Sequence, residues 1–220
     1  EAEEGRCVAG KELRGKGYGG WVRQVSARVS SEISLRERSF KNRKEVRVLD
    51  IVTVPFLEPK PADYQTENHL IDDTFYWMHA GQGDWKDAVA ALDAVEGPLW
   101  LNGYHSGYGK NDKVPGAETG PFAHSLTLVR PEAAAIRVQD ERDSAGNPKK
   151  KVRIAFGLNG FEYVLSVTDP VVMRAYSRCS FGEYPLREAI LCVSLGGLYR
   201  GNAYKLVATV ITPNMRPPKP

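Results

Sequence analysis

The sequence has few cysteines, few histidines and no long apolar run. Its 220 residues include three cysteines and four histidines. Such an odd, sparse set of cysteines excludes the disulfide framework of a small secreted protein and favours a reducing, cytoplasmic location. No apolar run approaches the roughly 18 residues that a bilayer-spanning helix needs, so we expect no membrane partner.

Metal, cofactor and catalytic motifs are also missing. The histidines have neither the His-x3-His nor the His-Glu-x2-His spacing of zinc sites; they stand at positions 69, 79, 105 and 124. Asp72 and Asp73 offer oxygen ligands for a divalent cation, but an acidic surface or a turn cap explains them better. His105-Ser106 lacks the Gly-x-Ser-x-Gly setting of a hydrolase nucleophile. We therefore predict no metal, no cofactor and no enzymatic activity.

The composition is that of a folded globular protein, but its charge is unevenly distributed. Hydrophobic residues make up 42% of the chain, charged residues 26% and aromatic residues 10%. The formal net charge is only +3. Residues 1–48 hold 12 Lys or Arg against 7 Asp or Glu, residues 49–120 hold 4 against 12, and residues 121–220 hold 14 against 8. The basic outer segments permit a polyanionic partner.

The apolar pattern predicts an all-β protein with one or two short helices. Asn159-Gly160 is the strongest hairpin signal, because both residues tolerate a positive φ. Helices are expected after Asp84 and after Asp169-Pro170, which suit N-cap and N1 positions. A mobile glycine-rich loop is expected at 10–20. The predicted strands are 6–9, 21–25, 46–57, 125–129, 133–139, 151–157, 161–167, 189–195 and 204–211.

The long segment 102–120, dense in Gly, Asn, Asp and Pro, is typical of a loop and serves as the predicted domain boundary. We expect an N-terminal unit with a helical insertion over 1–120 and a C-terminal unit over 121–213. Residues 214–220 form a proline-rich tail. Short strands, many glycines and few helices favour two small barrels, with a β-sandwich as the alternative.

Two loops combine cations with aromatic side chains. In Gly15–Gly20, Lys16 and the backbone N–H groups suit a phosphate, and either Tyr18 or the neighbouring Trp21 suits a stacked base. The segment Tyr199–Lys205 mixes aromatic, cationic and amide groups between two strong strands, as at the rim of a barrel. Both loops are also explained as plain hairpin tips, and Trp21 as a core residue.

Four short segments, taken in order, resemble the dual OB-fold domain family, which occurs mostly in bacteria and is associated with prokaryotic defence and mobile-element systems. The segments are Trp21-Val-Arg-Gln-Val-Ser26, Leu49-Asp-Ile51, Gln65-Thr-Glu-Asn68 and 194–208. The resemblance covers about residues 6–212. It implies two tandem OB-like barrels that recognise nucleic acid or a nucleotide-like ligand. OB barrels bind through aromatic stacking and a basic groove. The candidate binding residues are Lys16, Trp21, Arg23, Tyr199, Arg200, Tyr204 and Lys205.

The leading hypothesis is a non-enzymatic module that binds single-stranded DNA or RNA, or a nucleotide, in a bacterial defence-type system. The alternative is a protein-interaction module whose acidic middle segment docks a co-encoded protein. A third hypothesis, a small-ligand enzyme that uses the acidic segment and His105, predicts metal- or pH-dependent turnover. The salt dependence of the binding affinity distinguishes the first two hypotheses, because phosphate contacts weaken steeply as ionic strength rises.

Overall fold

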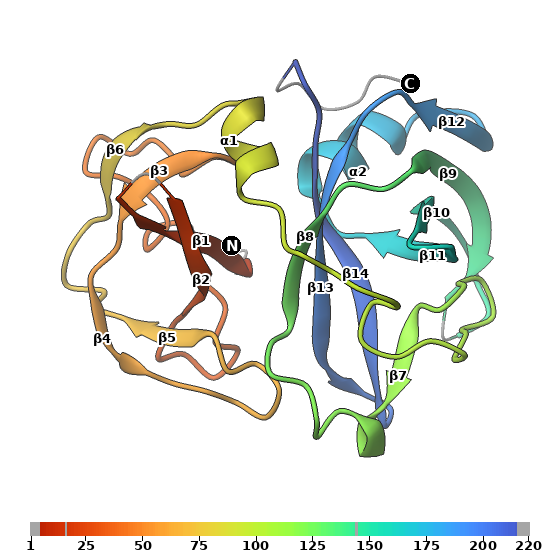
Figure 1. The fold of residues 1–220 in the computed structure, drawn as a ribbon, viewed down its shortest axis with the longest axis horizontal. Helices are drawn as coiled ribbons and strands as arrows, with labels where there is room; N and C mark the ends of the chain where they lie inside the picture. The colour runs from red at the N-terminus through yellow and green to blue at the C-terminus, as the bar shows by residue number, and fades with distance from the viewer. Residues whose placement is uncertain (1–4, 16, 144, 215–220) are drawn as a thin grey trace. The chain divides into compact units, whose positions relative to one another are not determined.

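A computed structural model describes residues 5–15, 17–143 and 145–214, and its backbone forms two compact units (Figure 1). The first unit runs to Ala91 and includes Ala123–Ser125, and the second comprises Leu92–Phe122 and the chain from Leu126 onward. The division therefore lies near residue 91, not at 120. The reason is that the predicted boundary loop belongs to the second unit: the side-chain amide of Asn111 donates to the Glu162 carbonyl, and the backbone amide of Lys205 donates to the Asp112 carbonyl.

The first unit contains a four-stranded sheet in the order β1-β2-β5-β4 and a separate pair, β3 and β6. β2 runs parallel to β5, and the other pairs are antiparallel. Its core is built on Ile33, Phe40, Ile71 and Trp77. The strands are β1 (Val8–Arg14), β2 (Gly17–Val25), β3 (Asp50–Thr53), β4 (Phe56–Pro59), β5 (Asn68–Ile71) and β6 (Met78–Gln82).

Two predictions for this unit were wrong in extent. The glycine-rich segment is mostly strand, because β1 and β2 continue pairing to Arg14 and Gly17, and the chain turns at Gly15 with φ of 58°. The long strand expected over 46–57 is broken at Pro55, whose missing N–H cannot join a ladder. The predicted helix is present as α1 (Trp85–Ala90), where the side chains of Asp84 and Asp87 form a capping box.

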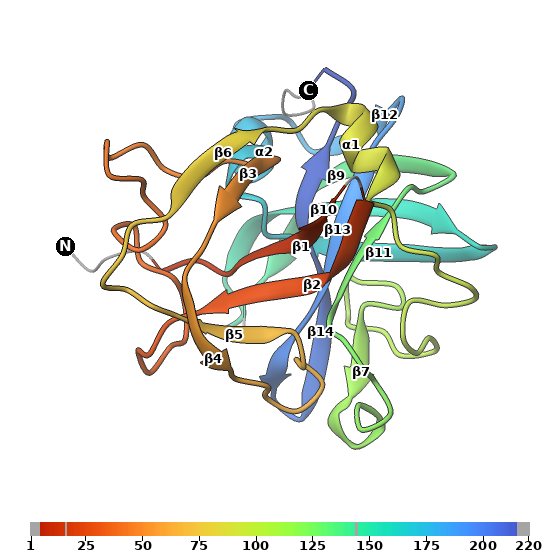
Figure 2. The ribbon, with the colours of Figure 1, turned by 60° about the vertical axis from the view of Figure 1, so that its left-hand side comes forward.

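The second unit is built on one eight-stranded sheet in the order β12-β9-β10-β11-β14-β13-β8, with β7 paired to β14 (Figure 2). β11 and β14 are parallel. Its strands are β7 (Lys113–Pro115), β8 (Leu126–Val129), β9 (Ala133–Arg142), β10 (Pro148–Leu158), β11 (Phe161–Val167), β12 (Gly182–Leu186), β13 (Ile190–Tyr199) and β14 (Asn202–Ile211). The other elements are η1 (Gly116–Glu118) and α2 (Pro170–Tyr176).

Local signals and packing agree closely in the second unit. Asn159 and Gly160 adopt φ of 51° and 76° and join β10 to β11 in a tight turn. Asp169 caps α2 by accepting from the amides of Val171 and Val172. Alternate residues of the strands are fully buried, among them Ile136, Ile154, Leu165, Leu191 and Val207. The all-β prediction with short helices is confirmed.

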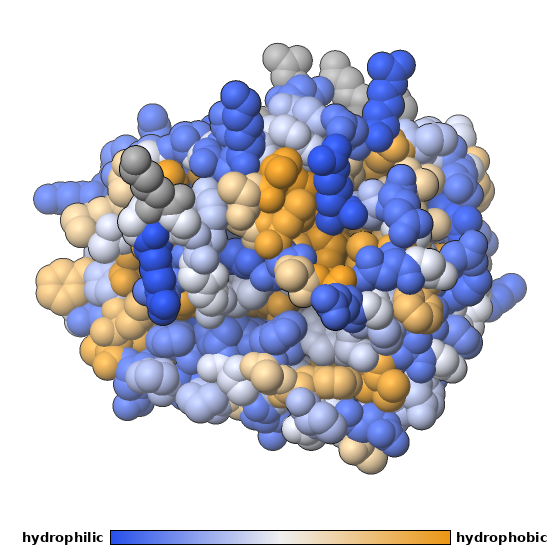
Figure 3. Space-filling view, viewed as in Figure 1, coloured by the Kyte–Doolittle hydropathy of each residue, from blue (hydrophilic) through white to orange (hydrophobic). Residues whose placement is uncertain are grey.

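Neither α-helix within the described ranges has the length and apolarity of a membrane span. Hydrophilic residues cover most of the face drawn in Figure 3, and apolar side chains interrupt them in patches. Apart from Asn214, the predicted proline-rich tail lies outside the described residues.

Candidate nucleic-acid interface

The end of the β13–β14 hairpin presents an aromatic and cationic surface. Arg200 and Gly201 form its two-residue turn, with φ of 50° and 76°. β13 carries one extra residue between the pairs Leu195–Lys205 and Leu198–Ala203. This bulge shifts the alternation, so that Tyr199 pairs with Asn202 on the outward face of the hairpin instead of following Leu195 into the core. The segment predicted as a loop is thus mostly paired strand.

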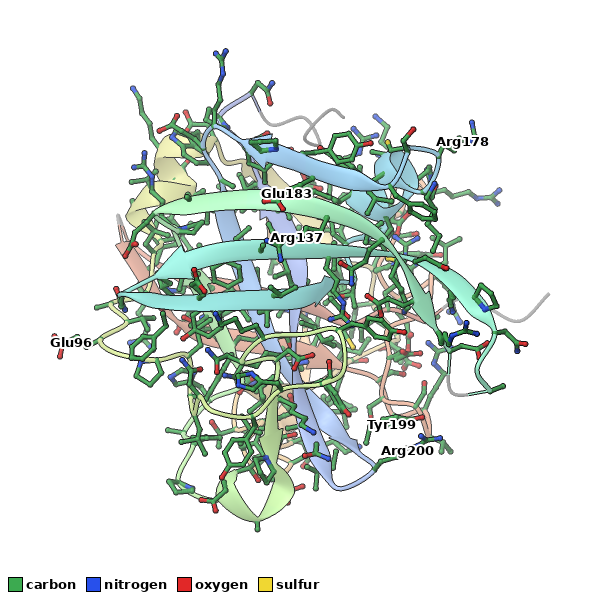
Figure 4. All side chains as sticks on the ribbon, turned by 90° about the vertical axis from the view of Figure 1, so that its right-hand side faces the viewer. Glu96, Arg137, Arg178, Glu183, Tyr199 and Arg200 are labelled. Atoms are coloured by element: carbon green, nitrogen blue, oxygen red, sulfur yellow. The ribbon has the colours of Figure 1, made fainter. Side chains whose placement is uncertain are left out.

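The side chains at this end form one group, called here the hairpin surface: Tyr199, Arg200, Tyr204 and Lys113. Tyr199 is 56% exposed, and the Arg200 guanidinium carbon lies 5.3 Å from its ring centroid. The rings of Tyr199 and Tyr204 lie 6.4 Å apart at an interplanar angle of 57°. Lys113 is the cross-strand partner of Tyr204. Figure 4 shows Tyr199 and Arg200 at the end of the hairpin.

The hairpin surface combines two features that proteins use to bind single-stranded nucleic acid, an exposed aromatic ring and nearby cations. An exposed ring accepts a base on its face, and the nearby cations attract phosphates. Lys113 was missed in the sequence, since only the long-range pairing of β7 with β14 brings it beside Tyr204. No local pattern marks such a pair.

The prediction of Lys205 as a binding residue was wrong, because its side chain lies inside the second unit. Its side chain is 1% exposed, and Nζ donates to the Leu101 carbonyl at 2.7 Å and to Asn102 Oδ1 at 3.0 Å. Burial lowers the pKa of Lys205 to about 7, and the charge of Asp112 opposes that change. A phosphate cannot reach this ammonium. Lys205 has the same parity on β14 as the buried Ala203 and Val207, so strict alternation was a signal that it points inward.

The prediction of Arg23 as a binding residue was also wrong. Its side chain is buried, Nη2 lies 3.2 Å from Glu67 Oε1, and the same nitrogen donates to Ser125 Oγ at 2.6 Å. This ion pair is internal to the first unit, so Arg23 has no exposed charge to offer a ligand. Trp21 is half-buried, and the Lys11 ammonium lies 5.6 Å from its ring centroid. Lys16 lies outside the described residues.

The outer face of β10 is partly covered by the loop that precedes β7. Arg153 on this face is buried, and its guanidinium forms two hydrogen bonds with Glu141, of 2.5 and 3.0 Å. Its Nη1 also lies 3.7 Å from Asp112 Oδ2. Asp112 in turn accepts from the amide of Ser106 at 2.7 Å. These charges are compensated within the protein, so this part of the sheet face is not an open phosphate site.

The pair His105-Ser106 is arranged differently from a nucleophile with its base. Ser106 Oγ donates to Asp112 Oδ2, while His105 Nδ1 accepts from the amide of Asn111 at 2.8 Å. The histidine and the serine are therefore committed to different loop contacts. Among the described residues, no three His, Cys, Asp or Glu side chains are grouped to hold a metal ion.

The comparisons with known proteins agree with the strand order. Along the chain, the five OB-fold strands of the second unit are β9, β10, β11, β13 and β14, with α2 between the third and the fourth. Within the sheet they lie in the order β9, β10, β11, β14 and β13, as the strands of an OB-fold do. No curated protein and no solved structure matches the chain. The model of the family described as the dual OB-containing domain matches residues 1–210. With 210 of its 220 residues matched, the chain belongs to the dual OB-containing domain family.

Proposed function

We propose that the chain is a non-enzymatic binding module for single-stranded nucleic acid, and that the hairpin surface of the second unit contacts the strand. The observation that carries this proposal is the exposed Tyr199 ring with Arg200 5.3 Å from its centroid. OB-folds bind oligonucleotides on the face of their second and third strands and with the loops after the first and fourth strands. The β13–β14 turn is the loop after the fourth strand, so the pair lies where this fold places ligand contacts.

A single strand fits the hairpin surface better than a duplex or a small molecule. A duplex keeps its base faces stacked inside, whereas an unpaired base is free to stack on Tyr199. The hollow between Arg130–Ala134 and Leu186–Ala189 measures about 180 Å³, below the roughly 300 Å³ of typical small-molecule sites, and includes no residue of the hairpin surface. Because the outer face of β10 is partly covered, we expect the strand to contact the end of the β13–β14 hairpin instead. DNA and RNA share the bases and phosphates that this surface would recognise.

No specific contact favours the alternative of an acidic docking segment. Asp84 and Asp87 serve the capping box of α1, and Asp93 accepts from the amide of Leu128 at 2.8 Å. Glu67 and Asp112 are buried among internal partners. Much of the acidity of the middle segment therefore stabilises the fold. A place in a bacterial defence-type system is part of the proposal and follows only from the family.

Fluorescence polarisation with labelled dT20 and rU20, each at two salt concentrations, tests the proposal. Purified protein is first freed of co-purifying nucleic acid, which its absorbance ratio reveals. We expect Tyr199→Ala to weaken binding roughly 5- to 150-fold, the equivalent of about 1–3 kcal/mol for one stacked base. Tyr199→Phe should retain affinity, because it keeps the ring.

The matched control is Tyr104→Ala, which removes a tyrosine that is 37% exposed in the same unit. Absence of micromolar binding to both oligonucleotides at low salt would refute the nucleic-acid function. Equal effects of Tyr199→Ala and Tyr104→Ala would refute the hairpin surface as the contact.

A further inference from the structure

The first unit carries a tight turn whose side chains are almost all cationic. Phe40 and Lys44 close the turn, with the Phe40 amide 2.9 Å from the Lys44 carbonyl and the Arg43 amide 2.8 Å from the Phe40 carbonyl. Arg43 adopts φ of 63°, as such a turn requires. The turn leaves Lys41, Arg43 and Lys44 exposed, together with Asn42. Three cations thus stand within four consecutive residues.

The two carboxylates of segment 36–47, Glu37 and Glu45, are already paired with other arginines. Glu45 lies 3.0 Å from Arg6 and 2.7 Å from Arg38, so it is shared between two guanidinium groups. Glu37 is paired with Arg28 at 3.3 Å. Within the part of the chain that the structure describes, the exposed cations of this segment form no ion pair; they are Arg36, Lys41, Arg43, Lys44 and Arg47. Their charge is available to an anionic partner.

Exposed aromatic side chains stand beside this turn. Phe40 forms a parallel bridge with Trp77, and both side chains are buried in the core of the first unit. The bridge holds the segment before β6 against Phe40, the first residue of the turn. Phe75 is 62% exposed and Tyr76 is 50% exposed. Arg36 lines one small hollow with these two rings.

We propose that this group, called here the turn surface (Arg36, Lys41, Arg43, Lys44, Phe75 and Tyr76), is a second contact site for single-stranded nucleic acid. Phosphates would lie on the cations and bases on the two rings. The choice of ligand rests on the proposed function, but the site shares no residue with the hairpin surface. The charge supports a polyanion, and the rings beside it support one with exposed bases.

Asp73 gives this site a gain-of-affinity test. It lines the same hollow as Arg36, Phe75 and Tyr76, so its carboxylate would repel an incoming phosphate. Asp73→Asn keeps the shape of the side chain and removes the charge. This variant should bind an oligonucleotide several-fold more tightly than the wild type. A misfolded protein would not show such a gain.

The main test compares two double variants with the same loss of charge, using the full chain and labelled dT20. Lys41→Ala/Lys44→Ala removes two cations of the turn surface. Lys60→Ala/Lys86→Ala removes two exposed lysines elsewhere in the first unit. Each lost phosphate contact reduces the magnitude of the negative slope of log K against log salt by about 0.7, so the slope of the first variant should be smaller by about 1.4. With equal affinities of the two proteins at 1 M salt, this difference makes the affinity of the variant at 0.1 M salt about 25-fold weaker.

The outcomes separate this inference from the proposed function. A reduced slope for Lys41→Ala/Lys44→Ala and an unchanged slope for Lys60→Ala/Lys86→Ala supports the turn surface. Equal slopes for the two variants overturn it, because only net charge would then matter. A loss with Tyr199→Ala but none with Lys41→Ala/Lys44→Ala overturns the turn surface and leaves the proposed function intact. Absence of wild-type binding overturns both.

Discussion

Replacing Lys205 by Met tests whether this buried lysine belongs to the fold or to the ligand site. The side chain is 1% exposed, and burial lowers its pKa from 10.5 to about 7. In the unfolded chain the lysine stays protonated up to about pH 10.5, whereas in the folded chain it loses its proton from about pH 7 upward. The unfolded state therefore binds more protons between these values. The stability of the wild type should therefore rise with pH between about pH 7 and pH 10.5. Below pH 7 the free-energy cost of burying the protonated lysine should be constant.

The two pKa values determine how much the free energy of unfolding changes with pH. Each pKa unit corresponds to about 1.36 kcal/mol, and the wild type is half deprotonated near pH 7. Between pH 7 and pH 9 the free energy of unfolding should rise by about 2 kcal/mol relative to Lys205→Met, which has no group to titrate there. The variant also leaves the Leu101 carbonyl and Asn102 Oδ1 without their donor, a loss that is independent of pH.

Urea unfolding followed by tryptophan fluorescence at pH 6, 7, 8 and 9 measures this difference. The transition that Lys205→Met moves identifies the second unit. A difference between wild type and variant that stays constant from pH 7 to pH 9 would show that Lys205 keeps its ordinary pKa, and would refute the desolvation argument. In oligonucleotide titrations the variant should keep the salt slope of the wild type, since it removes no phosphate contact.

Two further substitutions distinguish folding roles from binding roles. Arg23→Ala leaves the buried Glu67 carboxylate without its partner and should cost about 3–5 kcal/mol in the urea transition of the first unit. Arg23→Met/Glu67→Leu should recover part of that loss, and a reduced salt slope with normal stability would contradict the structural role. Gly201→Ala places a Cβ at φ of 76°, which should cost about 1–2 kcal/mol and weaken oligonucleotide binding by displacing the neighbouring Tyr199. An unchanged melting temperature together with unchanged affinity would contradict this reading of the turn.

Local chemistry explains why the second unit was more predictable than the first. Asn159-Gly160 and Asp169-Pro170 mark a turn and a helix start with their own side chains, and the structure has both. In the first unit, β5 and β6 are short and were not predicted, and only the first two residues of β4 lie within a predicted strand. The glycines before Trp21 suggested a loop because sequence alone does not show that β1 and β2 pair along them.

The candidate site illustrates the same limit. Arg200 is exposed because it lies in the two-residue turn, and Tyr199 is exposed because the bulge in β13 turns it to the outward face. Arg23 and Lys205 were proposed from their charge and from their place in the segments that resemble the family, and their burial depends on Glu67 and on the loop at 101–112, which are far away along the chain. The alternation of inward and outward residues on β14 indicated that Lys205 points inward. No residue next to Arg23 in the sequence indicated its ion pair with Glu67.

The distribution of positive charge shows why counting residues could not locate the turn surface. Residues 1–48 have 12 cations against 7 acids, yet the excess is not spread evenly over that segment. Arg6 and Arg38 share Glu45, and Arg23 lies against Glu67 from a segment with net negative charge. Those arginines are used inside the fold. The cations left over gather at the turn of 41–44, so the partners already present within the protein decide which charges can meet a ligand.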